Sequence, residues 1–238
     1  MNELHGPEWS RFYNFSEIWE YHGLFDAFGR STRTPITHEG KTGRPHTDSG
    51  FRLRSWPSTR NSFRDIPLSE SLENLPCPLD RNDWGCYFLR IELGDDFWDY
   101  IGRSKAGSKE GGYGIWKRLN LHLIQIAGTT ASNSGDPTKA FERMRECADG
   151  LGETTNSPEF FASRVKIALL KLDKNAIEDS YKASVLAEQN AHRLYIDKIR
   201  YLPKLCDTNE ATESKSQFGL AGLESLIQSV DTKVEKRT

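Results

Sequence analysis

The stretch from residue 84 to residue 104 constrains the fold more than any other part of the chain. It reads WGCYFLRIELGDDFWDYIGRS, two apolar runs separated by Gly94-Asp95-Asp96. In the first run, side chains would alternate between the two sides of a strand. One side has Tyr87, Leu89, Ile91 and Leu93, and the other has Cys86, Phe88, Arg90 and Glu92. Alternation on either side of turn residues is typical of an antiparallel hairpin. We therefore expect a strand over 86–93 and a returning strand over 97–101.

The remaining periodic segments are mostly helical. We expect helices at about 114–127, 136–148 and 175–199, a weak amphipathic helix near 219–230, and a buried strand in FASRVKIALLKLD. Aromatic residues recur at helical spacing in 8–28, and FRLRSW can form a short strand. This order predicts an α/β (α+β) fold with a small, mostly antiparallel three-stranded sheet flanked by helices. The expected segments are an N-terminal arm (1–83), a core (84–210) with a helical insertion, and a C-terminal helix and tail (211–238).

Composition excludes several classes of protein. The formal charge is −2, so no overall attraction to nucleic acid or anionic membranes is expected. The four cysteines are far apart, which argues against a zinc site or a disulfide scaffold. No signal peptide and no apolar run long enough to span a bilayer is visible. We expect a soluble, intracellular, cytoplasmic protein that does not enter membranes.

The arm nevertheless has a strong local excess of positive charge. Between residues 30 and 64 only Glu39 and Asp48 oppose the basic side chains, which are Arg30, Arg33, Lys41, Arg44, Arg52, Arg54, Arg60 and Arg64. Such an excess suits a phosphate-binding surface, and it equally suits a solvated loop. The charge alone does not separate the two interpretations.

The hairpin holds two tyrosines, Tyr87 and Tyr100, each beside a glycine. A two-residue turn at Asp95-Asp96 gives both tyrosines the same face, whereas a three-residue loop gives them opposite faces. An isolated pair of this kind more often serves packing than chemistry.

Three further side chains are candidates for chemistry. Arg118 and His122 are four residues apart on an expected helix and share a face, from which they can reach one phosphate, although such pairs are usually solvated. Glu188 lies on the packed face of the long helix, near Tyr181 and Ser184. A carboxylate there is costly unless it is paired or binds a cation.

Taken in order, Gly85-x-Tyr87, Tyr100-Ile101-Gly102, Arg118-x-x-x-His122 and Glu188 resemble the GIY-YIG nuclease superfamily. The resemblance covers about residues 84–210. Cys86 replaces the usual isoleucine, the segment from Gly102 to Arg118 is long, and 136–150 looks like an insertion. The family's late asparagine has only a weak candidate, Asn209.

The resemblance implies hydrolysis of a DNA phosphodiester with one divalent cation, Mg²⁺ or Mn²⁺, per active site. Glu188 would be the metal ligand, and a lone carboxylate suits a magnesium ion completed by waters and phosphate oxygens. Arg118 would stabilise negative charge in the transition state. Tyr87 is the favoured general base with His122 assisting, although the sequence does not rank the two. Tyr100 would bind the scissile phosphate or the water.

The type of nuclease follows from what surrounds the core. No appended DNA-reading module is recognisable, and the arginine-rich arm resembles those of type II restriction enzymes. The residues expected to contact double-stranded DNA are Arg44, Arg52, Arg54, Arg60, Arg103, Ser104 and Lys105. A homodimer on a palindrome is expected, or one core that cuts the strands in turn. A structure-specific or repair endonuclease, and a non-catalytic DNA-binding module on the same fold, remain alternatives.

Overall fold

The computed structural model describes residues 7–21, 51–54, 75–80, 82–104, 114–128, 139–173, 179–206, 210–211 and 216–234. The chain divides into two compact units. The first comprises Met1–Tyr13, Asn82–Ile115 and Arg164–Thr238, and the second comprises Asn14–Arg81 and Trp116–Ser163. The segment expected to form one core, 84–210, therefore contributes residues to both units.

The first unit is built on the predicted hairpin. Strands β4 (Gly85–Leu93) and β5 (Asp96–Ser104) pair antiparallel, with Leu93 opposite Asp96. The loop is therefore Gly94-Asp95, and the expected turn at Asp95-Asp96 is wrong by one residue. Gly94 has φ 59°, a left-handed conformation that glycine adopts without a side-chain clash. Glycine at the first loop position thus sets the register.

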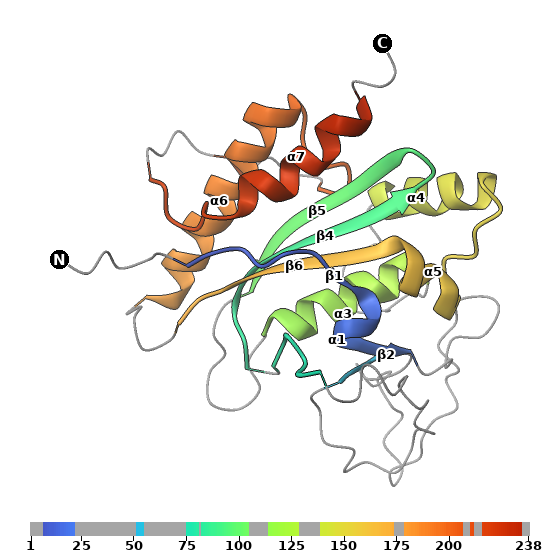
Figure 1. Ribbon diagram of the computed structural model, residues 1–238, viewed down its shortest axis with the longest axis horizontal. Coiled ribbons are helices and arrows are strands. Elements are labelled where there is room, and N and C mark those ends of the chain that lie inside the picture. Colours follow the sequence, from blue (N-terminus) through green and yellow to red (C-terminus); the bar gives the residue numbers. More distant parts are fainter. Residues whose placement is uncertain are drawn as a thin grey trace, which may run out of the picture. The chain divides into compact units, whose positions relative to one another are not determined.

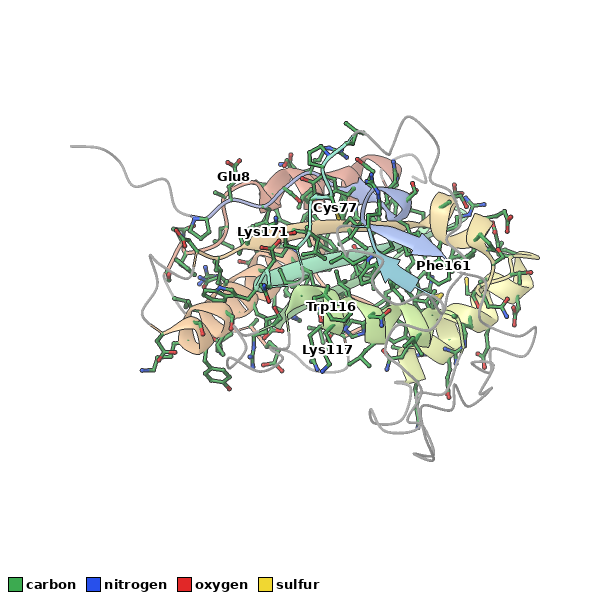
Figure 2. The ribbon with its side chains drawn as sticks, turned by 90° about the horizontal axis from the view of Figure 1, so that it is seen from below. Glu8, Cys77, Trp116, Lys117, Phe161 and Lys171 are labelled. Carbon is green, nitrogen blue, oxygen red and sulfur yellow. The ribbon has the colours of Figure 1, made fainter. Side chains whose placement is uncertain are left out.

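The sheet has four strands in the order β1-β6-β4-β5. Strand β6 (Val165–Lys171) pairs antiparallel with β4, so the mixed α/β class is confirmed. The expected number of three strands is wrong, because β1 (Tyr13–Asn14) adds a fourth. This strand is two residues long, too short to produce a visible alternation. At the far end of β6, Lys171 pairs with Asp83 at 2.8 Å (Figure 2).

Helices α6 (Ser180–Ile199) and α7 (Leu223–Val234) pack against the sheet (Figure 1). Their buried apolar side chains form one cluster with the strands, including Cys86, Phe88, Ile101, Ala187, Ala191 and Leu223. Helix α6 starts later than the expected residue 175, because the Asp179 carboxylate caps it by accepting the Lys182 N–H at 3.0 Å. The N-terminal segment joins this unit through Trp9, whose indole N–H donates to the Gly219 carbonyl at 2.7 Å.

The second unit contains short strands and three longer helices. Helix α1 (Phe15–Ile18) leads into β2 (Trp19–Tyr21), which pairs antiparallel with β3 (Phe51–Leu53). Of the helical spacing noted in 8–28, the described residues form one short helix, α1, and the segments on either side of it, 13–14 and 19–21, are strands. The short strand expected in FRLRSW is confirmed. The helices are α3 (Ile115–Ile126), α4 (Lys139–Gly150) and α5 (Pro158–Arg164).

Helix α5 occupies the start of a segment expected to be a strand. Pro158 stands at its first position, where proline favours a helix, and buried Phe161 packs against Phe15 with ring centroids 5.1 Å apart (Figure 2). The strand begins only at Val165. Within the described ranges, none of the helices combines the length and apolar character needed to cross a membrane.

Candidate functional site

Tyr87 and Tyr100 lie on the same face of the hairpin, as the parity of the turn predicted. Tyr87 is opposite Gly102, and Tyr100 is opposite Leu89. Their rings stack with centroids 6.0 Å apart and an interplanar angle of 17°. A Cβ atom at Gly102 would lie 2.5 Å from Cε1 of Tyr100 and 2.8 Å from the Tyr87 hydroxyl oxygen. The two phenols therefore need a residue without a side chain at position 102.

Arg103 and Glu188 form a second pair in the same unit. The Arg103 Nε donates to Oε2 of Glu188 at 2.6 Å, across 85 residues of sequence. The two side chains keep 28% and 12% of their surface exposed. The guanidinium carbon also lies 5.0 Å from the ring centroid of Tyr181, an exposed residue at the start of α6. This ion pair is thus partly open to solvent on one side.

The charges of this pair influence their surroundings. Burial by itself would lower the pKa of Arg103, but the charge and hydrogen bond of Glu188, aided by Tyr181, raise that pKa above its ordinary value. The Cys86 thiol lies across the strands from Arg103. Its pKa is raised first by burial and then by the negative charge of Glu188. The thiol is therefore protonated at neutral pH and is not a nucleophile.

Tyr87 and Arg103 occupy neighbouring rungs of the hairpin, and Tyr100 lies two rungs beyond Tyr87. Tyr87 pairs with Gly102 on one rung, and Cys86 pairs with Arg103 on the next. Because consecutive strand residues point to opposite faces, the phenols and the Arg103 side chain leave the sheet on different sides. The structure therefore brings together Tyr87 with Tyr100, and separately Glu188 with Arg103. Tyr87 and Arg103 lie near the end of the hairpin remote from its loop, and Tyr100 lies in the middle of β5.

Ser104 belongs to the tyrosine face and is nearly inaccessible. Its exposed fraction is 3%, and its hydroxyl has no hydrogen-bond partner among the described residues. Ser104 was expected to contact DNA beside Arg103, but burial makes a direct contact unfavourable in this conformation. Lys105, the next expected contact, lies outside the described residues.

Arg118 and His122 belong to helix α3 in the second unit, like Trp116 and Lys117 in Figure 2. Arg118 is exposed. His122 is buried, stacks on Phe141 with centroids 5.7 Å apart, and has Nδ1 3.0 Å from Oε1 of Gln125.

The pKa of His122 is lowered to about 4, chiefly by burial and also by the Arg118 charge, while the Gln125 hydrogen bond acts in the opposite direction. The imidazole is therefore neutral at pH 7. A neutral imidazole can accept a proton, but a low pKa makes it a weak base.

The arginines expected to read DNA are only partly described. Arg44 and Arg60 lie outside the described residues, as does Asn209, and of Arg52 only the backbone in β3 is described. The Arg54 guanidinium donates to the Glu17 carbonyl at 2.7 Å and to the Leu75 carbonyl at 3.2 Å. Two of its nitrogens are therefore used inside the second unit.

A metal could be held by Glu188 but not by a protein cage. Across the described ranges, no group of three or more His, Cys, Asp or Glu side chains is arranged to hold a metal ion. One partly exposed carboxylate fits a magnesium ion that keeps several waters and takes its other ligands from a substrate phosphate. Arg103 competes for that carboxylate.

Sequence reasoning missed the Arg103–Glu188 contact. The available signal was the cost of an unpaired carboxylate on a packed helix face, which requires a cation nearby. The strand alternation also placed Arg103 with Cys86, on the face that α6 covers.

Comparison of the chain with protein-family models, with curated proteins and with solved structures finds no match in any of the three. Function must therefore be inferred from the side chains at this end of the hairpin.

Proposed function

We propose that the chain is a divalent-metal-dependent endonuclease of the GIY-YIG type, which hydrolyses phosphodiester bonds in double-stranded DNA at a specific sequence, as type II restriction enzymes do. One observation carries this proposal: Tyr87, which stacks on Tyr100, lies one rung from Arg103, whose ion pair with Glu188 is partly open. Two phenols, a guanidinium and a carboxylate are the groups that metal-assisted phosphodiester hydrolysis uses.

Each group has a role in this proposal. Glu188 would hold the metal, which when bound supplies charge neutralisation at the phosphate and at the leaving 3′ oxygen. Arg103 offers a planar guanidinium to the non-bridging phosphate oxygens. Tyr87, which is buried in the DNA-free protein, would act as a phenolate and take the proton of the attacking water, and Tyr100 would donate a hydrogen bond to the phosphate.

The position of the scissile phosphate follows from the strand geometry. Tyr87 and Arg103 leave the sheet on opposite faces, so a phosphate can meet both only beyond the strand ends at Gly85 and Ser104. The roles expected for Arg118, in stabilising charge, and for His122, in assisting the base, stay predictions. So does a homodimer on palindromic DNA.

Digestion of a sequenced phage genome by the purified full-length chain tests the proposal. With Mg²⁺ present, we expect fragments whose mapped ends share one short sequence, and we expect a chelator to stop the cutting. Intact DNA with both Mg²⁺ and Mn²⁺ would contradict a catalytic function. Cutting of branched or damaged DNA in preference to plain duplex would favour a structure-specific or repair nuclease.

A pair of glutamate variants separates catalysis from binding. We expect Glu188→Ala to abolish cutting and to leave DNA binding in a gel-shift assay intact. Glu224→Ala is the matched control, because Glu224 is an exposed carboxylate paired with Lys198 on the same unit. If the wild-type chain binds DNA without cutting it and Glu188→Ala behaves identically, the chain is a non-catalytic DNA-binding module.

A further inference from the structure

The Arg103 guanidinium makes few contacts for a side chain held in an ion pair. Its Nε bonds Glu188, its plane lies near the Tyr181 ring, and 28% of its surface is exposed. Arg90, on the same face of the same hairpin, uses Nε and Nη2 on Asp99 and Nη1 on the Leu226 carbonyl. Arg103 also forms a side-chain hydrogen bond with Tyr181, but its greater exposure makes its guanidinium more accessible than that of Arg90 to an anion from solution.

The same carboxylate cannot satisfy a guanidinium and a divalent cation equally well. A metal bound to Glu188 would lie close to the positive charge of Arg103, and the two cations would repel each other. A phosphate removes this conflict, because a guanidinium fork matches a phosphate as well as a carboxylate and can bind it through two parallel hydrogen bonds.

We propose that Arg103 pairs with Glu188 in the DNA-free protein and transfers to a backbone phosphate when DNA binds, which removes the competing guanidinium charge from the carboxylate that would hold the metal. This inference rests on the proposed nuclease function. It adds that DNA binding prepares Glu188 to bind the metal. Tyr181 keeps the guanidinium near the surface during the exchange, since its exposed ring lies 5.0 Å from the guanidinium carbon. Metal and DNA then bind cooperatively.

Cooperativity of this kind is reciprocal: DNA strengthens metal binding by the same factor by which metal strengthens DNA binding. Direct ligation by a phosphate oxygen would also produce such coupling. The distinctive consequence of the Arg103 exchange is therefore in the DNA-free protein, where removal of the guanidinium charge should strengthen metal binding.

Mn²⁺ binding measured by electron paramagnetic resonance of the free ion tests this consequence. We expect Arg103→Gln to bind Mn²⁺ about tenfold more tightly than wild type without DNA, within the usual range of coupling between two sites. Arg103→Met, which retains contact with Tyr181, should do the same, and Arg103→Lys should resemble wild type. Lys204→Gln is the matched control, because it removes a partly exposed charge paired with Asp96 at the other end of β5 and should leave Mn²⁺ affinity unchanged.

A second experiment measures Mn²⁺ binding in the presence of a DNA duplex. This duplex contains the mapped cleavage sequence and has a methylene group in place of the leaving 3′ oxygen, so it cannot be cut there. We expect this duplex to tighten Mn²⁺ binding more in wild type than in Arg103→Gln. If Arg103→Gln and Arg103→Met bind Mn²⁺ as wild type does without DNA, the exchange is overturned. If the wild-type chain leaves DNA intact with both Mg²⁺ and Mn²⁺, the proposed function itself fails. If Glu188→Ala still binds Mn²⁺ and cuts DNA, Glu188 is not the metal ligand and the exchange is overturned. If Glu188→Ala loses both Mn²⁺ binding and DNA cutting, while Arg103→Gln and Arg103→Met bind Mn²⁺ as wild type does, only the exchange is overturned and the proposed function stands.

Discussion

Two arginine–carboxylate pairs project from the same face of the β4–β5 hairpin, and they differ in almost every physical respect. Arg90 and Asp99 are 2% and 0% exposed and share two hydrogen bonds of 2.8 and 3.0 Å. Asp99 also accepts the Tyr195 hydroxyl at 3.0 Å, and the Arg90 guanidinium lies against the Phe12, Phe88 and Phe97 rings. Arg103 and Glu188 share one hydrogen bond and remain 28% and 12% exposed.

The difference separates a structural ion pair from a candidate functional one. Burial and the Asp99 charge raise the pKa of Tyr195, so its hydroxyl stays protonated and continues to donate. A buried pair with satisfied donors has no capacity for a ligand, and it holds the middle of the hairpin to α6 and α7. At the strand ends, the partly open pair leaves a guanidinium that a ligand can use.

Removal of Asp99 should have the largest effect on stability. In Asp99→Ala, Arg90 would remain buried without its carboxylate, which typically costs about 3–5 kcal/mol of unfolding free energy. Urea denaturation followed by circular dichroism measures this loss. Asp96→Ala, which breaks the partly exposed pair with Lys204, is the control and should cost at most about 1 kcal/mol. Equal losses in the two variants would contradict the assignment of a structural role to Arg90–Asp99.

Acid should destabilise the fold through His122, which is buried as a neutral imidazole, in contrast to the charged Arg90–Asp99 pair. The pKa of His122 is lowered from 6.5 to about 4. The unfolded chain therefore takes up a proton at a higher pH than the folded chain, so the contribution of His122 to the unfolding free energy is complete above pH 6.5 and is lost as the pH falls toward 4. The loss should reach about 3 kcal/mol. His192, whose pKa is lowered by burial, acts in the same direction.

His122→Gln should make the unfolding free energy less dependent on pH between 7 and 4, measured by urea denaturation at several pH values. An unchanged slope would contradict burial of a neutral imidazole at this position.

A methyl group at Gly102 should disturb the tyrosine pair more than the fold. Gly102→Ala forces a contact of 2.5 Å with Tyr100 and should cost about 1–3 kcal/mol, as overpacking does. Cutting activity should fall further than this destabilisation explains, because both phenols are displaced. Gly150→Ala is the control, since a Cβ there meets no atom within 4 Å. If Gly102→Ala cuts DNA like wild type, the tyrosines are packing residues.

The smallest stability effect is expected at the open ion pair. Glu188→Gln should change the unfolding free energy by less than about 1 kcal/mol, because a partly exposed pair gains little over its hydrated charges. Urea denaturation measures the change. A loss similar to that of Asp99→Ala would mean that Glu188, like Asp99, serves the fold.

The sequence predicted local features well and long-range pairings poorly. The shared face of Tyr87 and Tyr100 was expected for a loop with an even number of residues, which the structure has, whereas a three-residue loop would have placed them on opposite faces. The exact register did not follow, since three consecutive turn-forming residues allowed more than one loop. The helix over Lys139–Gly150 and the long helix were expected within a few residues, whereas the start at Ser180 depended on the Asp179 cap.

The parts that failed depend on contacts between distant residues. Strand β1 has two residues and exists only through its neighbours in the sheet. The Arg90–Asp99 pair required the register to be known, and Arg103–Glu188 spans 85 residues. The cost of a buried carboxylate correctly implied a cation for Glu188, but a side chain and a metal ion satisfy that requirement equally well.

The rate of Mg²⁺-dependent cleavage by Glu188→Gln, measured on duplex DNA at enzyme excess, tests the central claim most directly. The open pair is proposed to serve catalysis and the closed pair to serve the fold. We therefore expect a variant that unfolds at the wild-type urea concentration, binds DNA and cuts at least about a thousandfold more slowly, as when a principal catalytic group is lost. A folded variant that cuts at the wild-type rate would contradict this account.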